Sequence, residues 1–100
     1  MTYLHDDARL IRSHLSSQAR PPEDSDALFL LYAVLMRAKG EHVTEVDVHD
    51  AWAAWMATRN LGHPALVPFE SLDTSAQSQD LPYVQAIHSA ARDRRATRNP

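Results

Sequence analysis

The strongest constraint on the fold is an unbroken apolar run, ALFLLYAVLM, at residues 27–36. A helix needs about 20 apolar residues to cross the hydrocarbon core of a bilayer, so this run is too short to span a membrane. A helix that is apolar nearly all round is instead typical of the centre of a domain, where it packs on several sides. Pro21 and Pro22 exclude helix before the run, and Gly40 stands after it, where a left-handed residue commonly ends a helix. We therefore predict a buried central helix over residues 26–39.

Three further helices are expected around the central one. The first has apolar residues at positions i, i+4, i+7 and i+11, which lie on one face of a helix. These residues are Leu4, Ala8, Ile11 and Leu15. The third begins where Thr44 is followed three residues later by Asp47, a pattern that resembles a capping box. The last begins at Asp80, a good N-cap residue, and accepts Pro82 in its first turn. The predicted fold is mostly α-helical, with helices at residues 3–17, 26–39, 45–60 and 81–95 and an ordered, proline-containing loop at 62–72.

A chain of 100 residues accommodates one domain. A domain of this size buries only about 60–70 % of the surface that its unfolded chain exposes, so nearly every large apolar side chain must enter one core. The composition permits such a core, because 44 % of the residues are apolar and 23 % are charged. The residues predicted to be buried are Leu28, Leu31, Leu35, Trp52, Trp55, Leu66 and Ile87.

The net charge of −3 conceals an uneven distribution. Residues 1–91 contain six lysines and arginines against twelve aspartates and glutamates, whereas residues 92–100 contain four arginines and one aspartate. We therefore predict a single acidic helical domain over residues 1–91, followed by a basic, flexible tail over residues 92–100. An acidic surface repels phosphate backbones, so nucleic-acid binding is disfavoured. The N-terminal sequence lacks the basic start and apolar stretch of a signal peptide, so we expect a cytoplasmic protein that does not enter a membrane.

Several kinds of site are disfavoured by the residue types in the sequence. The chain has no cysteine, which removes disulfides, thiolate nucleophiles and thiolate metal ligands. It has no HExxH pattern for zinc, and its serines fall in caps or polar turns, which gives no basis for a Ser-His-Asp set. Hence we predict no metal, no cofactor and no enzyme activity. A helix-turn-helix over LMRAKGEHVTEVDVHDAW is a weaker alternative, because its second helix would bring Glu45, Asp47 and Asp50 to the DNA phosphates.

The most distinctive stretch of the chain follows the central helix. It contains HDAWA at residues 49–53 and HPALVPFESL at residues 63–72, and Asp80 then heads the closing helix. Together, residues 49–90 resemble the RyR domain, the repeat found in ryanodine receptor calcium channels and in small bacterial and phage proteins. The pattern of that family is a histidine three residues before a Trp-Ala pair, then an HP.LVPY..L segment, then an aspartate before the last helix.

The resemblance implies a non-catalytic binding or interaction module that senses a small ligand such as a nucleotide. The ligand surface that it implies consists of His49, Trp52, His63, Phe69, Asp80 and Tyr83. The alternative is a structural or adaptor protein that uses its apolar loop or basic tail to bind a larger protein partner. The residue types alone favour plainer roles, since tryptophans at helical spacing fill cores, buried histidines make structural hydrogen bonds and Asp80 can cap a helix.

Overall fold

Helices account for most of the computed structural model, which describes the backbone of residues 2–98 and the side chains of residues 2–96. The main helices are α1 (Tyr3–Ser13), α2 (Asp26–Lys39), α3 (Glu45–Ala57) and α5 (Leu81–Arg98). A short helix, α4 (Thr74–Ser78), and two 3-10 turns at Gly40–His42 and Phe69–Ser71 lie between them. The prediction of a mostly helical fold is thus confirmed. Within residues 2–98, no helix is both long and apolar enough to cross a membrane.

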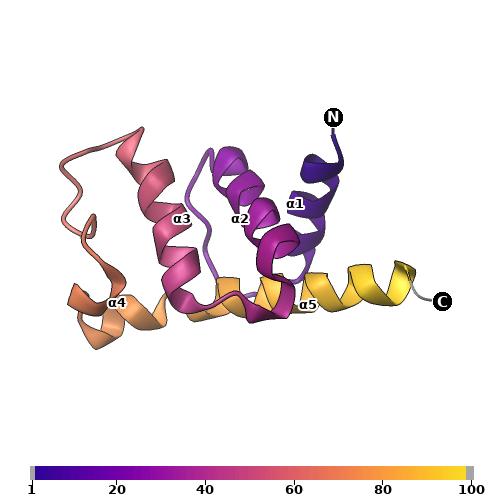
Figure 1. Cartoon of the computed structure of the whole chain (residues 1–100). Helices are drawn as coiled ribbons and strands as arrows, with labels where there is room; N and C mark the ends of the chain where they lie inside the picture. Colours follow the sequence, from indigo (N-terminus) through magenta and orange to yellow (C-terminus); the bar gives the residue numbers. More distant parts are fainter. Residues whose placement is uncertain (1, 99–100) are drawn as a thin grey trace.

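The main helices form a row of three with the fourth lying across them. α1 packs against α2 and α2 against α3, while α5 runs across one end of the row and contacts all three (Figure 1). Because α2 has helices on three sides, it is the central helix, as predicted. The segment that connects α3 to α5, including α4, extends along the flank of the molecule beside α3 (Figure 1).

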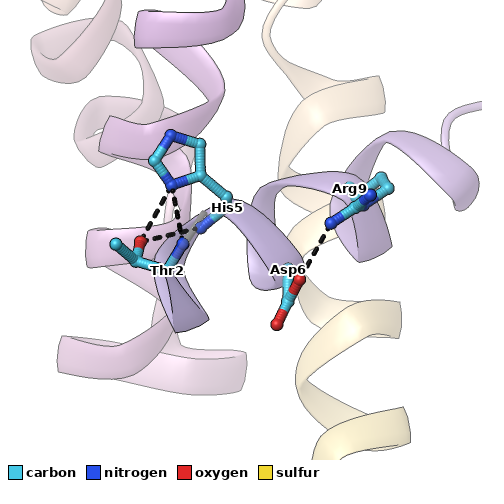
Figure 2. Close-up of polar contacts among 4 residues, drawn as sticks. All are labelled: Thr2, His5, Asp6 and Arg9. Carbon is cyan, nitrogen blue, oxygen red and sulfur yellow. Dashed lines mark hydrogen bonds and ion pairs between the residues drawn. The ribbon is translucent and has the colours of Figure 1, made fainter.

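Reciprocal hydrogen bonds fix where α1 begins. The backbone N–H of His5 donates to Oγ1 of Thr2 at 3.4 Å, and Nδ1 of His5 accepts from the N–H of Thr2 at 3.2 Å (Figure 2). This is a capping box in which histidine replaces the usual glutamate. On the next turn, Asp6 and Arg9 form an ion pair at 2.8 Å with both side chains largely exposed (Figure 2).

The predicted capping box of α3 is confirmed. The N–H of Thr44 donates to Oδ2 of Asp47 at 2.9 Å, and the N–H of Asp47 donates to Oγ1 of Thr44 at 3.3 Å. Nζ of Lys39 lies 2.8 Å from the same carboxylate oxygen, which ties the end of α2 to the start of α3. Between them, Gly40 has a φ of 55°, a value that favours glycine, so the turn depends on a residue without a Cβ.

Two helices are shorter than predicted, for the same local reason. α1 ends at Ser13 rather than at residue 17, and α3 ends at Ala57 rather than at residue 60. The hydroxyl of Ser13 donates to the carbonyl of Leu10 at 2.6 Å, and the hydroxyl of Thr58 donates to the carbonyl of Trp55 at 2.7 Å. Such side-chain bonds compete with the backbone bonds that would continue a helix.

Residues 92–98 of the segment predicted to be a flexible tail, 92–100, continue α5. Arg92 and Arg95 form ion pairs with Glu41 at 3.0 and 2.7 Å, and Nε of Arg94 lies 3.5 Å from Oδ1 of Asp7. The acidic residues of the domain thus bind the basic residues of its end, and this attraction favours an ordered helix. Residues 99–100 lie outside the described part of the chain.

The core lies where α1, α2, α3 and α5 meet. Leu28, Trp55 and Ile87 are buried there, as predicted. The prediction is wrong for four residues, which are only partly buried: Leu31, Leu35, Trp52 and Leu66. On α2 the reason is that one side has no helical neighbour, and Val34 on that side is 49 % exposed. Trp52 borders a pocket, and Leu66 lies in the loop after α3.

Candidate ligand-binding pocket

A pocket of about 590 Å³ opens between the connection that precedes α2, the helices α2 and α3, and the start of α5. This volume is in the range of small-molecule sites, which are about 300–1,000 Å³. Five of the six residues predicted to form a ligand surface line it: His49, Trp52, His63, Asp80 and Tyr83. We call this cavity the Asp80 pocket, because Asp80 is the one acidic residue among the described residues that line it.

Phe69, the sixth predicted residue, lies outside the lining of the pocket. Its ring meets that of His49 edge-on, with 6.2 Å between the ring centroids. Its carbonyl oxygen accepts a hydrogen bond from Nε2 of Gln77 at 3.1 Å. Phe69 therefore stabilises the pocket wall without lining the pocket. Its ring packs against His49, which lines the pocket, and its backbone carbonyl attaches the loop to α4.

Two walls of the pocket were not predicted from the sequence. Tyr32 lines it from α2, and Arg20 lines it from the connection between α1 and α2. Tyr32 carries the only polar side chain in the apolar run 27–36. Because a hydroxyl in such a run needs a polar environment, Tyr32 could have been identified from the sequence. No local signal identifies Arg20, because its position depends on how the chain returns from α1 to α2.

His49 holds the loop that closes one side of the pocket. It is 3 % exposed, and its Nε2–H donates to the carbonyl oxygen of Val67 at 2.6 Å. Its ring also stacks on that of Trp52, with centroids 5.6 Å apart and an interplanar angle of 24°. Val67 itself is 38 % exposed. The hydrogen bond to its backbone carbonyl, rather than burial of its side chain, therefore attaches this part of the loop.

His63 leaves one ring nitrogen free to bind a ligand. Its Nδ1 accepts a hydrogen bond from the N–H of Ala65 at 3.0 Å, so in the neutral ring the proton is on Nε2. The ring meets Trp52 edge-on at 5.0 Å, with an interplanar angle of 80°. Trp52 thus contacts two histidine rings and remains partly exposed. The wall therefore offers an aromatic surface and a hydrogen-bond donor.

Asp80 occupies the N-cap position of α5, as predicted, but its side chain does not act as the predicted cap. Its carbonyl oxygen accepts hydrogen bonds from the N–H groups of Tyr83 and Val84, both at 3.1 Å. The carboxylate oxygen Oδ2 is buried and has no hydrogen-bond partner among the described residues. Most buried polar atoms in proteins are hydrogen-bonded, so this oxygen indicates either a cost in stability or a missing ligand.

The surroundings of Asp80 disfavour its charged form. Burial raises the pKa of Asp80 to about 6, the positive charge of His49 opposes this rise, and Glu45 adds to it. Burial also raises the pKa values of Tyr32 and Tyr83, and the nearby carboxylate of Asp80 raises both further. The carboxyl group of Asp80 therefore gains and loses its proton close to neutral pH, which is unusual for an aspartate.

No arginine or lysine pairs with Asp80 among the described residues. Apart from Asp80, Arg20 is the only aspartate, glutamate, lysine or arginine among the described residues that line the cavity, and its side chain is exposed. Asp80 takes part in none of the ion pairs found between described residues. The same part of the chain contains no group of three side chains suited to hold a metal ion.

Replacing Asp80 by asparagine is expected to stabilise the domain at neutral pH and to leave its stability unchanged near pH 4. The folded carboxyl keeps its proton up to a pKa of about 6, whereas the unfolded one loses it near 3.8. Wild-type stability therefore falls as the pH rises from about 4 through 6, because over that interval the folded state binds more protons. Because the group is only partly buried, the gain expected at pH 7 is reduced to about 1–2 kcal/mol.

Urea unfolding of both proteins at several pH values between 4 and 8 measures this difference. Asp50→Asn is the matched control, because Asp50 is exposed on α3 and lies outside the pocket. A gain for Asp80→Asn that is equal at pH 4 and pH 7 would contradict the assignment of an unfavourable charge to Asp80.

The fold and the pocket together define a small helical domain with an aromatic cavity that contains one uncompensated carboxylate. Residues 2–92 match the family described as Domain of unknown function (DUF7701), so the chain belongs to that family. The resemblance to the RyR domain is therefore wrong. It depended on two short segments, a His-Trp pair on a helix and a proline-stiffened loop, whereas the DUF7701 match also covers α1 and α2. No curated protein and no solved structure matches the chain at a significant level.

Proposed function

We propose that this domain reversibly binds a small organic molecule of about nucleoside size in the Asp80 pocket and performs no chemistry on it. The observation that carries the proposal is the buried carboxylate oxygen of Asp80, which has no hydrogen-bond partner among the described residues and belongs to a residue that lines the cavity. A ligand that donates a hydrogen bond to the other oxygen, Oδ1, would stabilise the negative charge that the two oxygens share.

The walls of the pocket support a flat ligand. Trp52 is partly exposed there, and the rings of His49 and His63 restrain it on two sides. Tyr32 and Tyr83, whose ring centroids are 5.7 Å apart, contribute further aromatic surface. Aromatic side chains stack well on planar heterocycles, and polar groups placed among them fix the orientation of the bound molecule.

The charge distribution favours a nucleobase or nucleoside over a nucleotide with several phosphates. Arg20 is the only lysine or arginine among the described residues that line the pocket, so a triphosphate would meet one cation and the carboxylate of Asp80. The negative charge of residues 1–91 also repels phosphate groups. Among nucleotide-like ligands, we therefore propose a nucleobase or a nucleoside, in which the base makes the main contacts with the pocket.

The contacts of the histidines favour binding over proton transfer. Nε2 of His49 is engaged with the carbonyl of Val67, and Nδ1 of His63 with the N–H of Ala65. These bonds hold the loop, which is a structural task. A general base, by contrast, needs a nitrogen within hydrogen-bond reach of the group that it deprotonates.

Addition of nucleosides and their mono- and triphosphates to the 15N-labelled protein is expected to shift the amide signals around residues 49–52, 63–65 and 79–83 and the indole signal of Trp52. Trp52→Leu removes a stacking surface and is expected to weaken binding about tenfold, since base–aromatic stacking contributes about 1–3 kcal/mol. Leu61→Ala is the control, because Leu61 is 81 % exposed and lies outside the pocket. Pocket signals that stay unchanged with every compound would favour the adaptor alternative, in which a protein partner is bound instead.

A further inference from the structure

We infer that the ligand of the Asp80 pocket presents a flat, cationic N–H group, such as an amidinium, a guanidinium or a protonated aminoheterocycle, which pairs with Asp80 and packs against Trp52. This inference rests on the proposed function and narrows it to one chemical class. The argument uses the environment of Asp80, the shape of the aromatic wall and the charge of the domain.

Comparison with Asp7, a buried acid of this domain, shows what Asp80 lacks. Asp7 is 6 % exposed, and its carboxylate pairs with Arg37 at 2.5 Å and Arg94 at 3.5 Å. Oδ2 of Asp80 is also shielded from water, but no arginine or lysine pairs with this residue among the described residues. A charge withdrawn from water needs a counterion or a set of hydrogen bonds. A cationic ligand supplies both.

The carboxylate of Asp80 offers one oxygen to a ligand. Oδ2 is closed to solvent, so a ligand in the cavity reaches the group through Oδ1. Because the two oxygens share the negative charge, a cation bound at Oδ1 stabilises the whole carboxylate. Amidinium and guanidinium groups are planar cations whose N–H groups donate charge-assisted hydrogen bonds to such an oxygen.

The aromatic wall suits the same ligand class. A planar cation can lie over a tryptophan ring, which is the aromatic side chain that attracts cations most strongly. The negative charge of the domain also favours a cationic ligand, because residues 1–91 carry twice as many acidic as basic residues. In addition, Glu45 acts electrostatically on Asp80. Nε2–H of His63 remains available for an acceptor atom elsewhere on the ligand.

Three probes of nearly equal shape test the inference: benzamidine, which is cationic, benzamide, which is neutral, and benzoate, which is anionic. Each is titrated to millimolar concentration into the 15N-labelled full chain at pH 8. We expect benzamidine to shift the signals of Trp52, Asp80 and Tyr83 and to bind at least tenfold more tightly than the other two. Asp80→Asn is expected to remove this preference, whereas Asp50→Asn is expected to keep it.

The affinity for benzamidine is also expected to fall about tenfold from pH 8 to pH 5, because about a tenth of the Asp80 carboxyl groups remain ionised at pH 5 when the pKa is about 6. Asp80→Asn isolates this contribution from those of the other ionisable groups near the site. Those groups are Arg20 in the connection before α2, Tyr32 on α2, Glu45 and His49 on α3, His63 in the loop and Tyr83 on α5.

The outcomes separate this inference from the proposed function. If benzamide or benzoate binds the pocket as tightly as benzamidine, or if Asp80→Asn retains the preference, the inference is overturned while the proposal of a small-molecule pocket stands. If benzamidine shifts none of the NMR signals of the pocket residues, the inference is also overturned. The nucleoside titrations then test the proposed function separately.

Discussion

Replacing Phe29 by alanine is expected to lower the free energy of unfolding by about 3–5 kcal/mol. Phe29 is fully buried on α2, and its ring meets that of Tyr32 edge-on with 5.3 Å between the centroids. The guanidinium carbon of Arg12 lies 4.1 Å from the centre of the ring, so α1 rests on it as well. Removing the ring loses its burial and leaves a cavity between two helices and a side chain from α5, Tyr83.

The loss is large relative to the whole stability of a domain of this size, which is about 5–15 kcal/mol. Urea unfolding followed by circular dichroism measures it, and Val34→Ala is the matched control. Val34 lies on the same helix but is 49 % exposed, so its truncation is expected to change the stability by less than about 1 kcal/mol. A loss below about 1 kcal/mol for Phe29→Ala would mean that the core closes around the missing ring. Because Tyr32 and Tyr83 both contact Phe29 and line the pocket, the variant is also expected to weaken ligand binding.

Replacing Arg37 by methionine is expected to destabilise the domain by about 2 kcal/mol. The change keeps the apolar part of the side chain and removes the guanidinium, whose Nε lies 2.5 Å from Oδ2 of Asp7. The buried carboxylate of Asp7 then has only Arg94, at 3.5 Å. Breaking a fully buried pair costs about 3–5 kcal/mol, and the value expected here is smaller because the side chain of Arg37 is 36 % exposed.

The exposed pair of Asp6 and Arg9 on the same helix provides the control (Figure 2). Its side chains are 71 % and 63 % exposed, so Arg9→Met is expected to change the stability by less than about 0.5 kcal/mol. The double variant with Asp7→Asn and Arg37→Met is expected to regain at least half of the loss, since no unpaired charge remains buried. Chemical unfolding of the four proteins measures these differences. Equal losses for Arg37→Met and Arg9→Met would contradict the role of the buried charge, and no recovery in the double variant would assign the loss to the stacking of Arg37 on Tyr3.

The parts of the fold that depend on local sequence could be predicted. α2 begins and ends at the predicted residues, because its apolar run is bounded by prolines and Gly40. The start of α3 depends on Thr44 and Asp47, which are three residues apart and contact each other directly. The end of α5 could not be predicted in the same way, since the acids that pair with its arginines lie far away in the sequence.

The candidate site was predictable only in part, for a related reason. Residues 49–52, 63 and 80–83 are near one another in the sequence, so the histidine- and tryptophan-rich stretch indicated the region in which the predicted ligand surface lies. The unfavourable state of Asp80 could not be predicted. It depends on burial by several segments and on the lack of an arginine or lysine partner among the described residues, and neither condition leaves a sequence pattern.

The way the loop after α3 is attached has a consequence for how members of this family can diverge. His49 and Gln77 bind the carbonyl oxygens of Val67 and Phe69, and every amino acid has such an oxygen. The side chains of the loop can therefore be exchanged without loss of the bonds that hold its backbone. Substitutions in this segment can thus occur while its attachment to the helices beneath it stays the same.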